Sequence, residues 1–427
     1  MLSRTTYIHG CMILAAVTVA INVCAMNTNL SRPYNIFFKP DRKKDTRSFF
    51  TMFVEGGIGH AKGFDEDGSA NVMRIFNSHE DGIAMLQGFS ESSPQGQLLD
   101  KIQGVNVAPI DNGIRGNFLV SGDVKLDYGI GFGWRYFFPN DFSIGLYLPM
   151  YSMRLKNVCW QDQTPSTTPA DPDVRVKQYL TDNFFANVSA LGDGLYLKGW
   201  HRTGVGDLVA LLEWDRDFPQ QRPLLKNVRL NARLGLNIPT GLKADEDKLF
   251  ALAFGCDGAT GIIFGADLAV TFGDYMRAGV DVELLPLFGT VSSRRIKTNF
   301  NQTQSLLLEK TCVYTDWAMI QQFNIFVKFA DFYKGFKIDV DYQFLKQGSA
   351  QITPLSTAFP INIVNTGRNL EEWTAHDVIV KLGYDFKGTL REDAPVTPTI
   401  SFFAQMPFNG KNSILFTAAG VLLAAEF

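Results

Sequence analysis

The stretch Val-Lys-Leu-Asp-Tyr-Gly-Ile-Gly-Phe-Gly-Trp-Arg-Tyr-Phe-Phe, residues 124–138, alternates two kinds of side chain along its length. Every second position from Val124 to Phe138 is apolar, and Lys, Asp, Gly or Arg stands between most of them. Successive side chains of a β-strand point to opposite faces, so the pattern predicts a strand with one apolar and one polar face. The stretch is also much longer than the roughly 5–6 residues of a typical soluble strand.

The same alternation recurs through the chain, for example over 228–238, 276–284, 337–344 and 378–386. Such lengths suit the roughly 9–11 residues that a tilted strand needs to cross the hydrocarbon of a membrane. Short turns such as Pro139-Asn140 alternate with long loops such as 64–115 and 159–202. A soluble sandwich would alternate too, but long strands with aromatic residues on the apolar face favour a membrane barrel. The predicted fold class is all-β: a transmembrane, antiparallel, up-and-down β-barrel of about 12 strands, with about 14 as the alternative.

Composition narrows the function. Charged residues make up 19% of the 427-residue chain and the net charge is -3. A nucleic-acid partner is disfavoured, because no basic excess exists to neutralise phosphates. No run of 18 or more apolar residues occurs, so helices are not expected to carry this chain across a membrane.

The N-terminus indicates export. Arg4 precedes an apolar stretch over 11–21, and Val23 and Ala25 fit the small residues required for cleavage after Ala25. We therefore expect residues 1–25 to be a signal peptide and the protein to reside in the cell outer membrane. Residues 26–47, with the basic Arg42-Lys43-Lys44, form either a periplasmic segment or a plug of the lumen. Residues 48–427 form the predicted barrel.

The C-terminal strand carries an assembly pattern. Val421, Leu423 and Phe427 fall on one face, and an aromatic residue closes the chain. This looks like the terminal-strand signal by which bacterial outer-membrane barrels are recognised. The resemblance implies the barrel-insertion machinery as a partner, and the predicted barrel implies the outer-membrane lipid as another.

If the apolar faces meet lipid, the polar faces line the lumen. The candidate lumen-lining residues carry charges of both signs, and they are Asp127, Arg135, Asp207, Glu213, Arg229, Arg233, Arg277, Asp281, Glu283, Lys337, Asp339 and Asp341. One interpretation is that they pair across a narrow lumen and fill it. The other is a small charged channel or solute site, with Arg229, Arg233 and Arg277 as its anion-facing elements.

One pair of segments carries a family resemblance. Gly204-Val205-Gly206-Asp207-Leu208 opens one predicted strand, and the next strand ends in Pro239-Thr240-Gly241. This pairing resembles outer-membrane proteins of the phenol meta-pathway type, which are similar to the long-chain fatty acid and hydrocarbon transporters of the FadL type. The resemblance covers roughly 40 residues and implies uptake of hydrophobic small molecules.

Other chemistry is weakly supported. Cys159, Cys256 and Cys312 remain after cleavage and allow one disulfide with one thiol left over, in a pairing that the sequence does not decide. No Cys or His stands at metal-ligand spacing from another, so neither a metal nor a cofactor is expected. The remaining histidines lie near loops or strand ends, and we predict that the chain is not an enzyme.

Two functions remain. The first is an outer-membrane channel or transporter for small solutes, hydrophobic ones among them. The alternative is a surface or structural barrel whose long extracellular loops bind partners without transport. An outer-membrane hydrolase is a third and less favoured hypothesis.

Overall fold

A computed structural model describes residues 27–32, 34–37, 47–103, 114–165, 171–330, 333, 335–386 and 396–427. The predicted signal peptide, residues 1–25, and the basic Arg42-Lys43-Lys44 lie outside the described residues.

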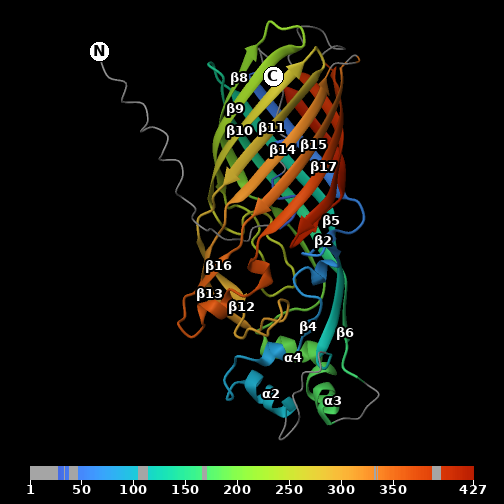
Figure 1. Ribbon diagram of the computed structural model, residues 1–427, viewed down its shortest axis with the longest axis vertical. Coiled ribbons are helices and arrows are strands. Elements are labelled where there is room, and N and C mark those ends of the chain that lie inside the picture. The colour runs from blue at the N-terminus through green and yellow to red at the C-terminus, as the bar shows by residue number, and fades with distance from the viewer. Residues whose placement is uncertain are drawn as a thin grey trace, which may run out of the picture.

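Twelve antiparallel strands form a closed ring (Figure 1), which confirms the predicted fold class and strand number. Each ring strand is hydrogen-bonded to two neighbours, and the pairing of β5 with β6 closes the sheet. Closure leaves no open edge of unpaired N–H and C=O groups, as a sheet in lipid requires. In ring order the strands are β5 (Asn117–Phe137), β1 (Ser48–Gly57), β20 (Ala418–Glu426), β18 (Thr397–Lys411), β17 (Trp373–Asp385), β15 (Phe336–Gln347), β14 (Ile320–Ala330), β11 (Met276–Leu285), β10 (Gly261–Phe272), β9 (Leu225–Ile238), β8 (Leu208–Pro219) and β6 (Phe142–Asp162).

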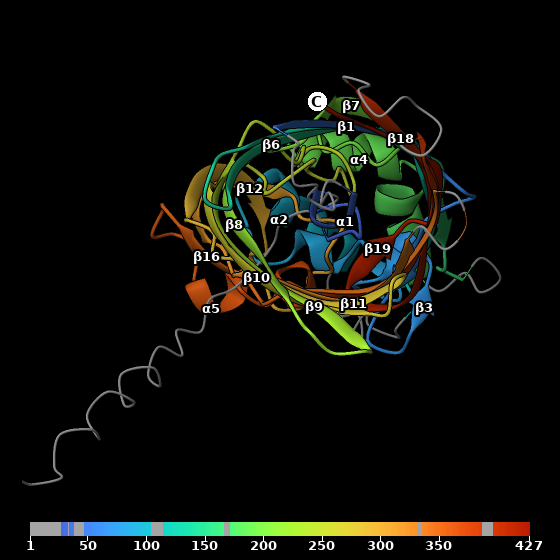
Figure 2. The same cartoon turned by 90° about the horizontal axis from the view of Figure 1, so that it is seen from above.

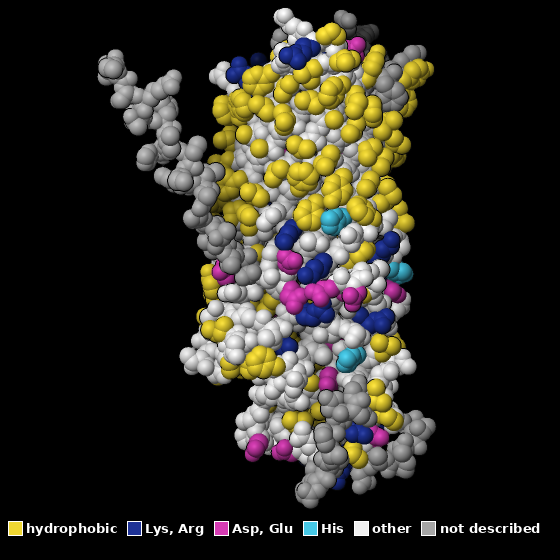
Figure 3. Space-filling view, in the orientation of Figure 1, with side chains coloured by type: hydrophobic (Ala, Val, Ile, Leu, Met, Phe, Trp, Pro, Cys, Tyr) yellow, Lys and Arg dark blue, Asp and Glu magenta, His cyan; other side chains and the backbone are white. Residues whose placement is uncertain are grey.

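The outer surface of the ring is apolar. Side chains that alternate with the buried ones, such as Phe132, Trp134, Leu234 and Leu236, are exposed. On the face that Figure 3 shows, hydrophobic side chains cover the ring, and charged residues border them on the side of the loops. A continuous apolar surface of this extent is the lipid-facing surface of a membrane barrel.

Two strands extend far past the ring. β5 and β6 each have 21 residues, or about 70 Å of extended chain. Beyond the ring, β5 also pairs with β4 (Glu80–Asp81) and β6 with β7 (Trp200–Val205). A bulge at Asp127 shifts the β5 register by one residue. The sequence alternation therefore changes face there: Phe132 and Trp134 point outward, whereas Val124 and Leu126 are buried under the loops.

The long loops fold into a compact region at one end of the barrel, which we call the head. Its two small sheets are β2 (Lys62–Phe64), β3 (Ser69–Ala70) and β19 (Ser413–Leu415), and β12 (Thr290–Ile296), β13 (Glu309–Asp316) and β16 (Gln351–Pro354). Its helices and helical turns are α2 (Pro94–Gln103), α3 (Asp171–Val176), α4 (Phe184–Leu191), α5 (Ile361–Val364), η1 (Val72–Arg74), η2 (Ala84–Leu86), η3 (Lys177–Thr181) and η4 (Arg368–Leu370).

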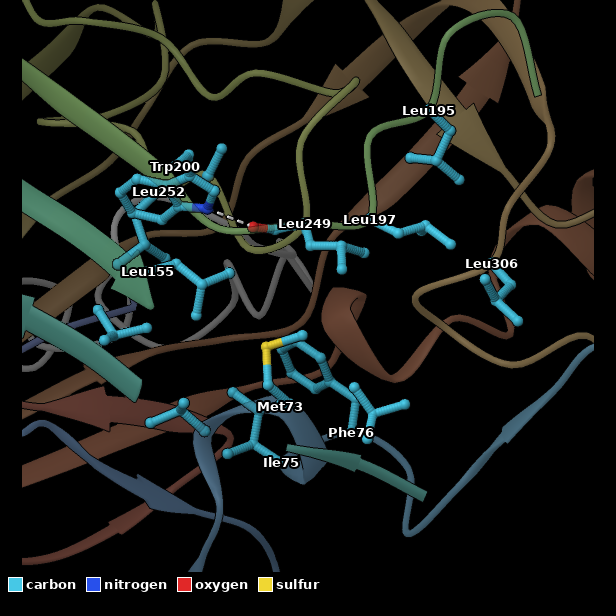
Figure 4. Packing of buried hydrophobic residues seen from close by; sticks show 14 of the residues in the cluster. Met73, Ile75, Phe76, Leu155, Leu195, Leu197, Trp200, Leu249, Leu252 and Leu306 are labelled. Carbon is cyan, nitrogen blue, oxygen red and sulfur yellow. Dashed lines mark hydrogen bonds between the residues drawn. The ribbon is translucent and has the colours of Figure 1, made fainter. Parts of the chain in front are cut away.

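The head has its own hydrophobic core, built from loops that are distant in sequence. Met73 and Phe76 from the first long loop belong to the same cluster as Leu249 and Leu252 (Figure 4). The indole of Trp200 donates a hydrogen bond of 2.6 Å to the carbonyl oxygen of Leu249. None of the described helices is long and apolar enough to cross a membrane.

Candidate functional site: the barrel lumen

The residues 27–32 and 34–37, which we call the N-terminal segment, lie inside the ring of strands. The segment ends in the single helical turn α1 (Tyr34–Phe37), which Figure 2 shows enclosed by the sheet. Asn27, Leu30, Arg32 and Phe37 are all buried. The segment has no apolar alternation of its own, so its place in the lumen depends on contacts with the wall.

Asn29 fixes the half of the segment nearer the head. Its amide nitrogen donates to Asp377 Oδ1 at 2.7 Å and to the carbonyl oxygen of Phe416 at 2.8 Å. Its amide oxygen accepts from the Phe416 backbone N–H at 2.9 Å, and its carbonyl oxygen accepts from Gln405 at 3.1 Å. These bonds satisfy buried polar groups that would otherwise cost free energy inside the barrel.

A charged cluster holds the middle of the segment. Tyr34 donates a hydrogen bond of 2.6 Å to Glu283 Oε1, and Arg32 forms an ion pair with the same carboxylate. Arg233 lies on the other side of Glu283 at 2.8 Å and bonds both oxygens of Asp281 at 2.7 and 2.8 Å. Buried charges are stable only when paired in this way.

Aromatic rings hold the end of the segment. The ring of Phe37 lies 4.4 Å from that of Phe403 and 5.1 Å from that of Phe53, between centroids. Tyr34 stacks on Tyr147 at 5.6 Å. The lumen therefore has an aromatic region beside its charged cluster.

The remaining predicted lumen residues mostly form pairs on the inner wall. Arg135 contacts Glu213 at 2.8 Å and the hydroxyl of Tyr147 at 2.7 Å. The ammonium of Lys337 lies 3.0 Å from Asp385. Further contacts are Arg229 with Asp215 at 2.7 Å, Lys381 with Asp339 at 3.1 Å and with Asp341 at 3.6 Å, and Arg277 with Thr271 at 3.4 Å.

Asp127 and Asp207 lie apart from this network. Asp127 sits at the bulge of β5 and contacts Arg154 and His201, whose side chains are 36% and 62% exposed. Asp207 sits in the break between β7 and β8, where it accepts hydrogen bonds from Asn237 at 2.8 Å and from the backbone N–H groups of Gly241 and Cys256 at 3.0 and 2.6 Å. Asp207 thus ties the 241–256 loop to the wall.

Sequence reasoning missed several lumen residues. Asp215 follows Glu213 at the strand period of two, and Asp377 precedes Ile379 and Lys381 in the same way, so extending each alternation by one step would have found both. The lumen positions of Arg32, Tyr34 and Phe37 have no such signal, because they arise from contacts between distant parts of the chain.

A cavity of about 220 Å³ lies where the lumen meets the head. Its wall is mainly apolar, with Phe250, Leu252 and Trp317, and Asn27 of the N-terminal segment also lines it. A larger groove of about 840 Å³ lies next to it and shares Arg294 among its lining residues. Arg294 forms ion pairs with Glu246 and Asp257, and all three residues of this triad line both the groove and the cavity.

Glu80 joins two loops of the head. Its carboxylate accepts a hydrogen bond of 3.0 Å from the backbone N–H of Ser305. Burial disfavours the charged form and raises the pKa of Glu80 to about 7, although hydrogen bonds from Thr303 and Ser305 oppose the shift. Glu80 therefore changes charge near neutral pH.

All three described cysteines are free thiols, Cys256 buried and Cys159 and Cys312 exposed, so the disulfide considered from sequence does not form here. Among the described residues, no group of His, Cys, Asp and Glu has the arrangement of a metal site.

The residues of the predicted assembly signal lie on the last ring strand and just after it. β20 carries Val421 and Leu423 and pairs with β1 and β18. Leu423 and Phe427 are exposed. Their role in recognition by the insertion machinery stays a prediction.

Fold and surface together define a class: the chain is a β-barrel of the bacterial outer-membrane type. No protein-family model and no curated protein matches the chain. A solved outer-membrane channel from Pseudomonas putida is similar over 91% of this chain and 100% of its own, with 10% identity and a TM-score of 0.47. A FadL homologue from Pseudomonas aeruginosa is similar over 90% of both chains, with 9% identity and a TM-score of 0.29. The toluene transporter TbuX from Ralstonia pickettii is similar over 95% of this chain and 96% of its own, with 10% identity and a TM-score of 0.31.

Proposed function

We propose that the protein is a gated outer-membrane channel for small, largely apolar solutes, and that the N-terminal segment is its plug. The observation that carries the proposal is the position of this segment. It runs from the cavity, which Asn27 lines, to the aromatic region around Phe37, and Leu30, Arg32 and Tyr34 are buried along that path. Because the segment belongs to none of the sheets, it can leave without breaking the closed ring.

The lining of the cavity supports the solute class. A cavity of about 150 Å³ lined by Leu, Ile and Phe is large enough for benzene, and this one measures about 220 Å³. Its apolar side chains suit a small hydrocarbon frame. Asp245 and Gln304, also in its lining, provide polar partners for one hydroxyl or carbonyl group.

The route that we propose has three parts. A solute first meets the groove, then passes the Arg294 triad into the cavity, and finally follows the path that the N-terminal segment vacates. The segment is held by the ion pair of Arg32 with Glu283 and by the hydrogen bonds of Asn29. Loss of these contacts exchanges buried polar pairs for water, so the open state is accessible only at a free-energy cost.

The experiment is uptake of benzyl alcohol into vesicles with a lipopolysaccharide outer leaflet, which slows its direct permeation. We compare the full processed chain with a variant that lacks residues 27–37. We expect faster uptake through both than through protein-free vesicles, and the fastest through the truncated variant. Equal uptake in all three would overturn the proposal.

The head supports the second candidate, binding of an extracellular partner. Val174, Tyr179, Phe185 and Tyr196, on or near α3, η3 and α4, are exposed apolar side chains outside the lipid-facing band. Replacing Tyr179 and Phe185 with serine should leave permeation unchanged and weaken adhesion to the partner if the head serves this function. Unchanged adhesion would contradict it.

A further inference from the structure

Two aromatic side chains project from the wall into the same part of the lumen. Phe53 on β1 and Phe403 on β18 are both buried, and β20 lies between their strands in the ring. Their rings meet edge to face, with centroids 6.2 Å apart. This arrangement is a favourable one for an aromatic pair.

The neighbouring strands are shaped to accept these rings. At Gly131 on β5, a Cβ atom would lie 2.1 Å from Phe53 Cε1. At Gly420 on β20, a Cβ atom would lie 2.7 Å from Phe403 Cζ. Both glycines therefore leave room that a larger residue would fill, so the space around Phe53 and Phe403 is built into the barrel wall.

A third ring fills this space, and it does not come from the wall. Phe37 of α1 lies 4.4 Å from Phe403 and 5.1 Å from Phe53, and both pairs are tilted at 40° and 48°. The contacts of Phe37 with Phe53 and Phe403 are therefore those that the aromatic ring of a bound solute would make in the same place. We call the space beside Phe53 and Phe403, which Phe37 fills, the ring slot.

We propose that the ring slot is a binding site for an uncharged solute with a single aromatic ring, and that Phe37 occupies it as an internal substitute while the channel is closed. This inference rests on the proposed channel function and specifies its substrate class. A solute that binds the slot must displace Phe37 and so favours departure of the plug. Solute binding and departure of the plug are coupled, because the solute binds only when Phe37 is outside the slot.

The slot distinguishes aromatic from saturated rings. A flat ring presents a negative face and a positive edge, which match the edge and face of Phe53 and Phe403, whereas a saturated ring of similar size offers only apolar area. Each such pair is worth about a two- to tenfold difference in affinity.

The test measures binding of fluorobenzene and fluorocyclohexane to the detergent-solubilised full chain by ¹⁹F NMR. Phe37→Ala empties the slot, and Phe37→Ala with Phe403→Leu removes part of its wall while retaining a side chain of similar volume. Phe402→Leu is the matched control, because Phe402 is the neighbouring residue on β18 and is 60% exposed on the outer face. Heat-dependent mobility in gels checks that each variant retains the folded barrel.

We expect Phe37→Ala to bind fluorobenzene about tenfold more tightly than the unaltered chain does, and to prefer it over fluorocyclohexane. Adding Phe403→Leu should reduce this preference about two- to tenfold, and adding Phe402→Leu should not change it. Equal binding of both rings by Phe37→Ala, or no gain over the unaltered chain, would overturn the proposal. This experiment measures binding, whereas the uptake of benzyl alcohol measures permeation. The ring-slot proposal can therefore be overturned while the channel proposal stands, and the channel proposal can be overturned while the ring slot still binds aromatic rings.

Discussion

Tyr34 and Glu283 are 249 positions apart in the chain, yet the tyrosine hydroxyl donates a hydrogen bond of 2.6 Å to the carboxylate inside the barrel. Arg32 and Arg233 contact the same carboxylate, Arg32 from the N-terminal segment and Arg233 from the wall. Glu283 is therefore the point where the N-terminal segment and the charged wall share one anion. This shared position makes Glu283 the natural target for loosening the proposed plug.

Glu283→Ala should raise the open probability of the channel. Removing one partner from a buried charged cluster costs about 3–5 kcal/mol, because the cations left behind remain buried. Release of Arg32 with the segment relieves part of this cost. Single-channel recording should show openings at least tenfold more often than in the unaltered chain. Glu66→Gln, which changes an exposed carboxylate in the head, should behave like the unaltered chain. No increase in openings of Glu283→Ala would count against the proposed plug.

Asp207→Ala should detach the 241–256 loop from the wall. The change removes three hydrogen bonds to one carboxylate, and each bond to a charged group contributes about 1.5–3 kcal/mol. Cys256, which is buried and whose backbone N–H bonds Asp207, should then react with maleimide. In the unaltered folded chain only Cys159 and Cys312 should react. Asp274→Asn, in an exposed turn, is the control. An unreactive Cys256 in Asp207→Ala would show that Asp207 does not hold the 241–256 loop against the wall.

The stability of the head should fall as the pH rises. The pKa of Glu80 is about 7 in the folded chain and 4.5 ordinarily, so the folded state holds the proton more tightly. The contribution of Glu80 to the free energy of unfolding is therefore complete below pH 4.5. It is lost as the pH rises to about 7, a change of up to about 3 kcal/mol.

Hydrogen exchange at the Ser305 amide, corrected for the intrinsic rate, should show more protection at pH 5 than at pH 8. Glu80→Gln should remove most of this difference, whereas Glu91→Gln, at an exposed site in the same loop, should preserve it. Protection that does not depend on pH in the unaltered chain would contradict the assignment.

Arg294→Ala should join the groove to the cavity. Arg294 lines both spaces, and we propose that its ion pairs with Glu246 and Asp257 separate them. We expect faster uptake of benzyl alcohol and, more strongly, of bulkier alcohols. Lys310→Ala is the matched control, because Lys310 lines the groove but not the cavity. Slower or unchanged uptake in Arg294→Ala would show that the triad is not a barrier.

The alternation of side chains was enough to predict the barrel. A period of two can be recognised locally, and every strand shows it because one of its faces contacts lipid. It failed where one residue is inserted. Beyond the bulge at Asp127, Val124 and Leu126 turn inward, and no local signal marks that point. The break at Gly206-Asp207 likewise divides one expected strand into β7 and β8.

The site was less accessible to sequence reasoning. Arg233, Asp281 and Glu283 were found because they lie on the inward face of regular strands, although their contacts with one another were not. The positions of Tyr34 and Phe37 in the lumen could not be predicted, because a short irregular segment has no periodic pattern that indicates which wall residues it contacts. Their positions follow from long-range packing against Glu283, Phe53 and Phe403.

The ion conductance of single barrels in planar bilayers tests the plug most directly. The chain that begins at residue 26 should be closed for most of the recording, and the variant that lacks residues 27–37 should conduct steadily at a larger and constant level. If both forms gave the same conductance, the N-terminal segment would not be what closes the lumen.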